Sequence, residues 1–245
     1  MHMPQNRWLA FLSHLGISLL IFLALLLLIV FFWYPGALFT AAGGWAGIRI
    51  IIGVDLVIGP LLTLVVYDIS KPRPVLFRDL AIIALVQLSC LAAGTYIVYH
   101  ERPVAVIYVY DRFYVSKLAD LGETEEGREL GLSPMTPRVF YSDIGRLADE
   151  SGASPEAIIR LYDLAGKSLA ARTDLYAPFP TQRAEATALF EDGDRPEYPG
   201  HGDDCFTIKL VSTYETGIAC YDVEAGRFRQ FVRGELNTRS ANADR

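Results

Sequence analysis

The chain has 245 residues, of which 52% are hydrophobic and 20% are charged, and its formal net charge at pH 7 is −6. The charges are distributed unevenly. Residues 1–100 contain five basic and three acidic side chains, whereas residues 101–245 contain 17 basic and 25 acidic ones. A nucleic-acid-binding domain needs a basic surface, so the acidic second region argues against nucleic acid as a partner. That region is long enough for one compact domain with its own core.

Three stretches of 20 residues in the first region are almost entirely apolar, namely Leu15–Tyr34, Ile48–Tyr67 and Leu80–Tyr99. A helix of about 20 residues is about 30 Å long, which matches the hydrocarbon core of a bilayer. We therefore predict a membrane protein with three N-terminal transmembrane helices, which form a transmembrane domain over residues 1–100. The first stretch exceeds the apolar core of a signal peptide, so we expect it to remain as a span.

The basic residues near these stretches predict how the chain is oriented. The loop between the second and third stretches carries Lys71, Arg73 and Arg78, whereas the loop between the first two, residues 35–47, carries no charge. Lysine and arginine are enriched in cytoplasmic loops. We therefore place the N-terminus and the basic loop in the cytoplasm, and residues 101–245 outside it. The basic loop is interpreted as a topology signal that also contacts lipid headgroups.

The second stretch contains a carboxylate, Asp55, as the eighth of its 20 residues. A charge near the bilayer centre costs at least about 2.5–3.5 kcal/mol, so Asp55 has to face another helix, a cavity or a partner, or be protonated. Contact with a partner and an internal hydrogen bond both remain open. Pro60 frees the carbonyl of Leu56 and favours a kink. Gly53 and Gly59 allow another helix to pack closely.

The second region alternates strand and helix signals before a polar tail. Ser154 is a suitable N-cap, Pro155 suits the first helical position, and Glu156 favours the positive end of the helix dipole. We expect helices at Asp143–Glu150, after Ser154 and at Thr181–Phe190, and strands at Val104–Tyr110, Phe113–Ser116, Arg138–Tyr141, Phe206–Val211, Gly217–Val223 and Arg227–Arg233. These elements predict one extracytoplasmic α+β domain over residues 101–236, with an antiparallel sheet on which the helix after Ser154 packs. Residues 237–245 are expected to form a flexible tail.

Cysteine spacing and motifs limit the chemistry that this chain performs. Cys205 and Cys220 lie 15 residues apart in the outer domain, where an oxidising compartment allows them to pair. A disulfide is favoured over two free buried thiols. The string from His201 to Cys205 matches no zinc or calcium signature. Motifs of hydrolases, phosphate-binding loops and metalloproteases are absent from the sequence. We therefore expect no catalytic residue, cofactor or metal, and a protein that is not an enzyme.

The second stretch and its flanks resemble the TfpX/TfpZ family of type IV pilin accessory proteins. The resemblance is carried by Gly53-Val54-Asp55-Leu56-Val57-Ile58-Gly59-Pro60-Leu61-Leu62-Thr63, by Tyr67-Asp68-Ile69-Ser70-Lys71-Pro72, by Asp79-Leu80 with Gln87, and by Arg102-Pro103 before a strand with Asp111-Arg112-Phe113. It covers about residues 10–115, and the later domain matches the family only in general character.

The resemblance implies a multi-pass inner-membrane protein of a Gram-negative bacterium that stabilises or presents a major pilin before its polymerisation. Its partners would be the apolar transmembrane helix and the periplasmic head of that pilin, together with membrane lipids. On this basis we hypothesise that Asp55, Gly59 and Pro60 shape a groove for the pilin helix. Gly53 and Thr63 belong to the same motif.

Two other classes of protein fit the sequence less well. A membrane-anchored sensor or ligand-binding protein would need a deep pocket within residues 101–245 and a cytoplasmic output module. The longest predicted cytoplasmic piece has only about a dozen residues, which is too short for a domain. A small transporter would need more spans or a symmetric oligomer, and more polar groups along a path.

Overall fold

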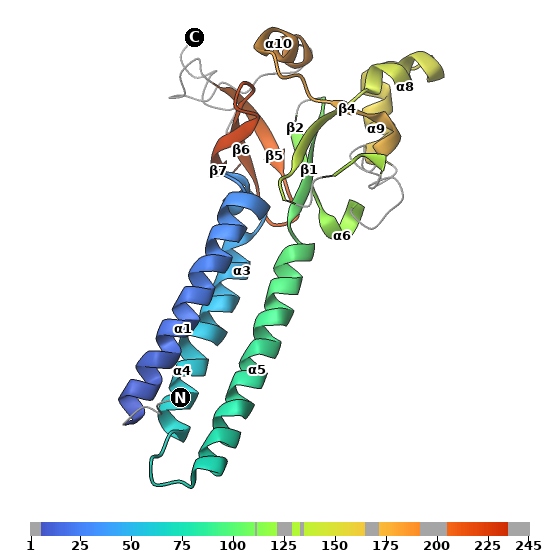
Figure 1. Cartoon of the computed structure of the whole chain (residues 1–245). Coiled ribbons are helices and arrows are strands. Elements are labelled where there is room, and N and C mark those ends of the chain that lie inside the picture. Colours follow the sequence, from blue (N-terminus) through green and yellow to red (C-terminus); the bar gives the residue numbers. More distant parts are fainter. Residues whose placement is uncertain are drawn as a thin grey trace. The chain divides into compact units, whose positions relative to one another are not determined.

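The computed structural model describes residues 6–110, 112–121, 129–132, 135–164, 172–191 and 205–234. The chain divides into two compact units (Figure 1). The first comprises Met1–Val30 and Gly44–His100, and the second comprises Phe31–Gly43 and Glu101–Arg245. The predicted domain limits at residues 100 and 236 stay a prediction. The string from His201 to Asp204 and the predicted tail at 237–245 lie outside the described residues.

The first unit is helical. Its elements are α1 (Arg7–Leu28), α3 (Gly44–Ile51), the π-helix η2 (Ile52–Ile58), α4 (Gly59–Val66) and α5 (Arg73–His100). A second π-helix, η1 (Ile29–Trp33), continues α1, and its residues from Phe31 onward are assigned to the second unit. These elements form three continuous helices, each long and apolar enough to cross a membrane: Arg7–Trp33, Gly44–Val66 and Arg73–His100. Each helix begins before the apolar stretch that predicted it. The first does so because the Asn6 side chain caps it, by accepting a hydrogen bond from the backbone N–H of Leu9.

The second of these helices is the central one. It packs along both α1 and α5, whereas the backbones of α1 and α5 come close to each other at few points. Two glycines bring it close to α5. A Cβ atom on Gly47 would lie 2.6 Å from a methyl group of Val98, and one on Gly59 would lie 2.3 Å from Oε1 of Gln87. The absence of a side chain at these positions therefore sets the distance between the helices.

A π-helical segment occupies the part of the central helix where the sequence predicts a disturbance. The segment η2 ends directly before Gly59 and Pro60. The backbone N–H of Gly59 donates to the carbonyl of Val54, five residues earlier. Proline has no N–H, and its ring clashes with the carbonyl four residues before it, so the wider π-helical turn relieves a conflict in the normal α-helical pattern. Asp55 lies inside this segment.

The second unit contains a seven-stranded sheet in the order β4-β3-β1-β2-β5-β6-β7. The strands are β1 (Pro103–Val109), β2 (Arg112–Lys117), β3 (Arg138–Ser142), β4 (Tyr176–Pro178), β5 (Phe206–Val211), β6 (Thr216–Asp222) and β7 (Arg227–Arg233). The predicted antiparallel pairing is confirmed for four of the six strand pairs. It is wrong for the other two, because β1 pairs with β3 and β2 pairs with β5 in parallel. Long connections separate the strands of each parallel pair in the chain, and such connections leave the direction of the returning strand free. The sheet is therefore mixed.

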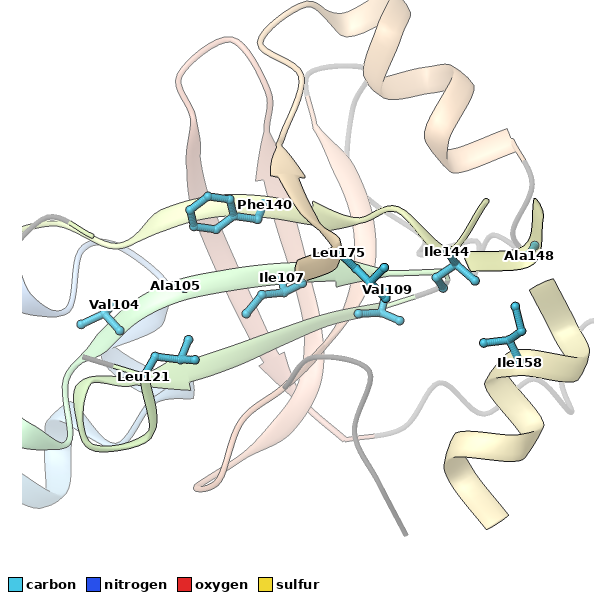
Figure 2. Close-up of a cluster of buried hydrophobic side chains, with 10 residues drawn as sticks. All are labelled: Val104, Ala105, Ile107, Val109, Leu121, Phe140, Ile144, Ala148, Ile158 and Leu175. Atoms are coloured by element: carbon cyan, nitrogen blue, oxygen red, sulfur yellow. The ribbon is translucent and has the colours of Figure 1, made fainter. Parts of the chain in front are cut away.

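Strand β1 is the centre of this sheet, and all of its residues are buried. Its continuous apolar sequence is typical of a strand that is covered on both faces. On one face, Ile107 and Val109 pack with Phe140, Ile144 and other side chains of a core cluster (Figure 2). The helices α8 (Ile144–Ser151) and α9 (Pro155–Leu164) contribute to this cluster. Shorter helices are α6 (Leu118–Leu121), the 3-10 helix η4 (Thr173–Leu175) and α10 (Arg183–Glu191).

An aromatic cluster lies on the opposite face of β1, because alternate residues of a strand point to opposite sides. The ring of Phe113 lies 5.3 Å from that of Tyr108, 5.4 Å from that of Tyr221 and 5.1 Å from that of Phe228, between ring centroids. Phe179 contacts Phe113 with 5.7 Å between centroids. These rings join β1, β2, β6 and β7 into one packed layer.

The segment between the first two long helices is part of the second unit. It contains α2 (Leu38–Ala41), which contacts β7. The backbone N–H of Ala37 donates to the carbonyl of Phe228 at 3.1 Å, and the Ser212 hydroxyl donates to the carbonyl of Ala41. Leu38 and Ala41 are buried. An uncharged segment that the sequence presents as a loop therefore serves as a packing element of the sheet domain.

Gly43 ends this segment with a positive φ of 83°, and a Cβ atom there would lie 2.7 Å from the ring of Tyr214. The Tyr214 hydroxyl donates to Oε2 of Glu101 at 2.9 Å, and the Lys117 ammonium donates to the same oxygen at 2.8 Å. The hydrogen bond from Lys117 and, less strongly, that from Tyr214 hold the pKa of the Glu101 carboxyl below its ordinary value. The Tyr214 ring is thereby fixed against the glycine.

A disulfide joins Cys205 and Cys220 on the neighbouring strands β5 and β6 of this unit. Cys205 directly precedes β5, and Cys220 lies within β6. The two cysteines are separated by 15 residues in the sequence. The remaining cysteine, Cys90, is a free thiol on the exposed surface of α5.

We predict that Gly43→Ala lowers the free energy of unfolding by about 3 kcal/mol, because it adds a methyl group at a positive φ and into the Tyr214 ring. The matched control is Gly226→Ala. Gly226 has a φ of 60°, but none of the described atoms lies within 4 Å of its Cβ position. This change should cost only about 1–2 kcal/mol. Thermal unfolding of the purified protein in detergent measures both, and equal losses would contradict the tight contact with Tyr214.

We also predict that the denatured protein, taken from its native host without reduction, carries one reactive thiol. A maleimide-linked polymer should add a single mass increment, at Cys90, before reduction and three increments after it. Cys90→Ser should then show no increment until a reductant is added. Three increments from the unreduced wild-type protein would contradict the disulfide.

Candidate functional site

Asp55 lies at the midpoint of the central helix. Eleven residues precede it and eleven follow it within Gly44–Val66, so it is about 16 Å from either end of this helix at the α-helical rise. It is 4% exposed, although most of the apolar residues around the outside of the unit are exposed. Its position is thus deeper than the apolar stretch alone predicts, because the helix starts at Gly44 rather than at Ile48.

The carboxyl group of Asp55 has no hydrogen-bond partner among the described residues, for either of its oxygens. The Gln87 amide nitrogen lies near this carboxyl but outside hydrogen-bond geometry, and its hydrogen bonds go to the Ser18 hydroxyl and the backbone carbonyl of Asp55. Burying a polar group without a hydrogen bond is costly, and burying a charge without a partner costs more. The internal hydrogen bond, one of the two interpretations left open by the sequence, is therefore not found in the described part of the chain. A group of this kind in a membrane helix is by default a functional-site candidate.

Polar side chains from all three long helices meet next to Asp55. The His14 ring lies 2.6 Å from the Thr63 hydroxyl through Nδ1 and 2.8 Å from Oε1 of Gln87 through Nε2. The Gln87 amide nitrogen donates to the Ser18 hydroxyl at 3.1 Å and to the backbone carbonyl of Asp55 at 3.2 Å. We call His14, Ser18, Thr63 and Gln87 the polar network. Hydrogen bonds of this kind hold helices together where hydrophobic driving force is weak.

The geometry of this network fixes the orientation of the Gln87 amide. The Gln87 amide nitrogen donates to two acceptors, so Oε1 of Gln87 accepts from Nε2 of His14. In a neutral imidazole, Nδ1 then accepts from the Thr63 hydroxyl. The carbonyl of Gly59, at 3.3 Å from that hydroxyl, is the more distant alternative acceptor. The network therefore uses both ring nitrogens of His14 and both polar atoms of the Gln87 amide, and none of these hydrogen bonds reaches the Asp55 carboxyl.

A cavity of about 380 Å³ opens beside this network within the helical unit. It is lined by Ala10, His14, Ile17, Ser18, Ile21, Asp55, Thr63, Tyr67, Leu80, Ala84, Gln87, Leu88 and Leu91. Most of these side chains are apolar, and the polar ones gather around Asp55. Ile17 on α1 and Leu88 on α5 are largely exposed, so they form the rim of the cavity. We call this space between α1 and α5, with η2 and α4 as its floor, the groove.

The structure separates the residues of the sequence-predicted motif. Asp55 and Thr63 line the groove. Gly59 and Pro60 are buried in the contact between the helices instead, and Gly53 has no described neighbour within 4 Å of its Cβ position.

Two residues of the polar network, His14 and Ser18, were not predicted from the sequence. They are four positions apart in an apolar helix, which places them on one face. This spacing of two polar residues is the signal that identifies them.

Ion pairs with Asp79 on α5 hold the basic loop. The Lys71 ammonium donates to the carboxylate of Asp79 at 2.9 Å and to the carbonyl of Val66 at 3.2 Å. Arg78 lies 3.7 Å from the same carboxylate, and Arg73 begins α5. Lys71 thus joins the end of α4 to the first turns of α5. A contact of this loop with lipid headgroups stays a prediction.

We predict that Gly59→Ala destabilises the helical unit by about 1–3 kcal/mol, because the new methyl group displaces Gln87 and breaks the polar network. Gly53→Ala is the matched control in the same helix. It meets no described neighbour and should be neutral or slightly stabilising, since alanine favours a helix over glycine. Thermal unfolding in detergent compares the two, and a neutral Gly59→Ala would show that the helices do not approach this closely.

The chain resembles three known proteins of the bacterium Dichelobacter nodosus. Over 108 residues, which is 44% of the chain, it is 34% identical to "Fimbrial assembly protein, serogroup I", 33% identical to the serogroup E1 protein and 32% identical to the protein of serogroups C1 and C2. The match spans 42% of each of the first two relatives and 82% of the third. Neither a protein-family model nor a solved structure matches the chain. From its relation to the serogroup C1 and C2 protein, the chain belongs to the family of the fimbrial assembly proteins.

Proposed function

We propose that this chain is a pilus-biogenesis accessory protein of the TfpX/TfpZ type, which stabilises or presents a major type IV pilin in the bacterial inner membrane before assembly. The observation that carries the proposal is the relation to proteins named for fimbrial assembly, in a chain with three helices that are apolar and long enough to cross a membrane. The match covers less than half of the first two relatives, so the pilin partner and the mode of action belong to the proposal.

The proposed orientation has the N-terminus and the basic loop in the cytoplasm, and the sheet domain in the periplasm. The segment Phe31–Gly43 packs within the same compact unit as the sheet, which favours one side of the membrane for both. The loop with Lys71, Arg73 and Arg78 would then lie on the other side, in agreement with the enrichment of basic residues in cytoplasmic loops. The disulfide between Cys205 and Cys220 fits an oxidising periplasm.

The proposed role is non-enzymatic and requires binding alone. A pilin held in the membrane before assembly would present an apolar helix and a globular head, and an accessory protein would have to cover both. The groove is a site of suitable chemistry for a helix, and the sheet domain is a separate folded surface for the head. A membrane-anchored periplasmic sensor is the alternative function, and it is not favoured by a cavity that lies among the helices.

Deletion of the gene in its native host tests this function. We expect steady-state pilin to fall while the pilin transcript is unchanged, and surface pili to fall with it, because an unprotected pilin would be degraded in the membrane. Immunoblots, transcript measurement and electron microscopy provide the three readouts, and a plasmid copy of the gene should restore them. Normal pilin with fewer pili would move the role from stabilisation to assembly. Normal pilin and normal pili would contradict the proposed function.

A further inference from the structure

We propose that the groove between α1 and α5 holds one transmembrane helix of the partner, and that this helix supplies a hydrogen-bond donor to the Asp55 carboxyl. The identity of the partner as a pilin rests on the proposed function. The location of the site, the number of helices and the chemistry at Asp55 come from the structure.

The packing of the helical unit leaves a place for a fourth helix. The central helix packs along both α1 and α5, whereas α1 and α5 are joined mainly through the hydrogen bonds of Gln87 with His14 and Ser18. Four helices pack around a common core with every helix beside two others, and the three long helices described here take three positions of such an arrangement. The groove is also lined mainly by apolar side chains, as a surface that receives an apolar helix requires.

The chemistry of the groove points to a donor on the incoming helix. The described residues around Asp55 satisfy one another and leave both of its carboxyl oxygens without a partner. Lipid tails offer no donor, so a groove that faced lipid alone would keep a polar group unpaired near the bilayer centre. A side-chain N–H or O–H on a partner helix at this depth would complete the network. The Asp55 carboxyl would then favour a partner helix that is apolar and that carries its donor at the same depth in the membrane.

The rim of the groove allows the site to be mapped directly. Ile17 on α1 and Leu88 on α5 line the groove and are 60% and 59% exposed. Leu19 and Val86 are matched controls. Each lies two residues away, about 200° around the same helix, with 43% and 54% exposure, and neither is among the residues that line the groove.

A photoreactive amino acid placed at each of these four positions, in the full-length chain in its native host, identifies the neighbour in the membrane. We expect irradiation at Ile17 and Leu88 to give a product that antibodies against the host pilin recognise, and the Leu19 and Val86 positions to give at least about tenfold less. Equal yields from all four positions would overturn the groove as the binding site. A product that contains two copies of this chain and no pilin would overturn it as well.

Substitution of Asp55 tests the donor. With the photoreactive group at Leu88, Asp55→Ala should lower the pilin product about three- to tenfold, the range that one hydrogen bond between membrane helices supports. Asp55→Asn retains an acceptor oxygen of the same size and should lose less. Immunoblots of the chain itself and the intact disulfide show that each variant is present and folded. Undiminished product from Asp55→Ala would overturn the role of the carboxyl.

These outcomes separate the inference from the proposed function. If deletion of the chain lowers pilin but the groove positions give no preferential product, the function stands and the site is wrong. If deletion leaves pilin and pili normal, the function fails. A product with pilin from the groove positions would then still establish the site as a helix-binding groove.

Discussion

A carboxyl group at the middle of an apolar helix has to be kept away from lipid, and the architecture of the helical unit follows from this constraint. The central helix, which carries Asp55, has a helix packed on either side. Glycines at the contacts with α5 bring the helices close enough for side-chain hydrogen bonds, and a π-helical segment before Pro60 contains the carboxyl. The polar network satisfies its own members, while Asp55 has no partner among the described residues. In the arrangement that we propose, a partner helix supplies the missing hydrogen bond to this carboxyl.

The sheet domain solves a different problem, which is how to build one core from two separate parts of the chain. The segment Phe31–Gly43 contributes buried residues to a unit whose remainder begins 58 residues later, at Glu101. Its backbone contacts β7. The ring of Tyr214 packs so closely against Gly43 that a Cβ atom at this position would lie 2.7 Å from it. This segment connects α1 and α3 to the same folded unit, into which α5 also continues at Glu101. This covalent arrangement limits how far α1 and α3 can separate while the sheet domain stays folded.

Local signals in the sequence predicted most of the elements, whereas their pairing was not predictable. The strand at Phe206–Val211, the strand at Arg227–Arg233 and the helix after Ser154 have their expected positions, because alternation and capping are local properties. The parallel pairs of β1 with β3 and of β2 with β5 were missed, because they depend on long connections.

In the membrane region, Asp55 stood out from the sequence by the energetic cost of its charge alone. His14 and Ser18 did not, since His14 lies just before the predicted stretch and a single hydroxyl within it is inexpensive. Only the fold shows that they meet Thr63 and Gln87.

The lifetime of the pilin is the property that a protective partner in the membrane would change most directly. Pulse–chase labelling would follow newly made pilin in the membrane fraction of cells with and without this chain, in a background in which pilus assembly is blocked. We predict a markedly shorter pilin half-life when the chain is absent, even though no pilus can form in either strain. An unchanged half-life would contradict a protective role for this chain.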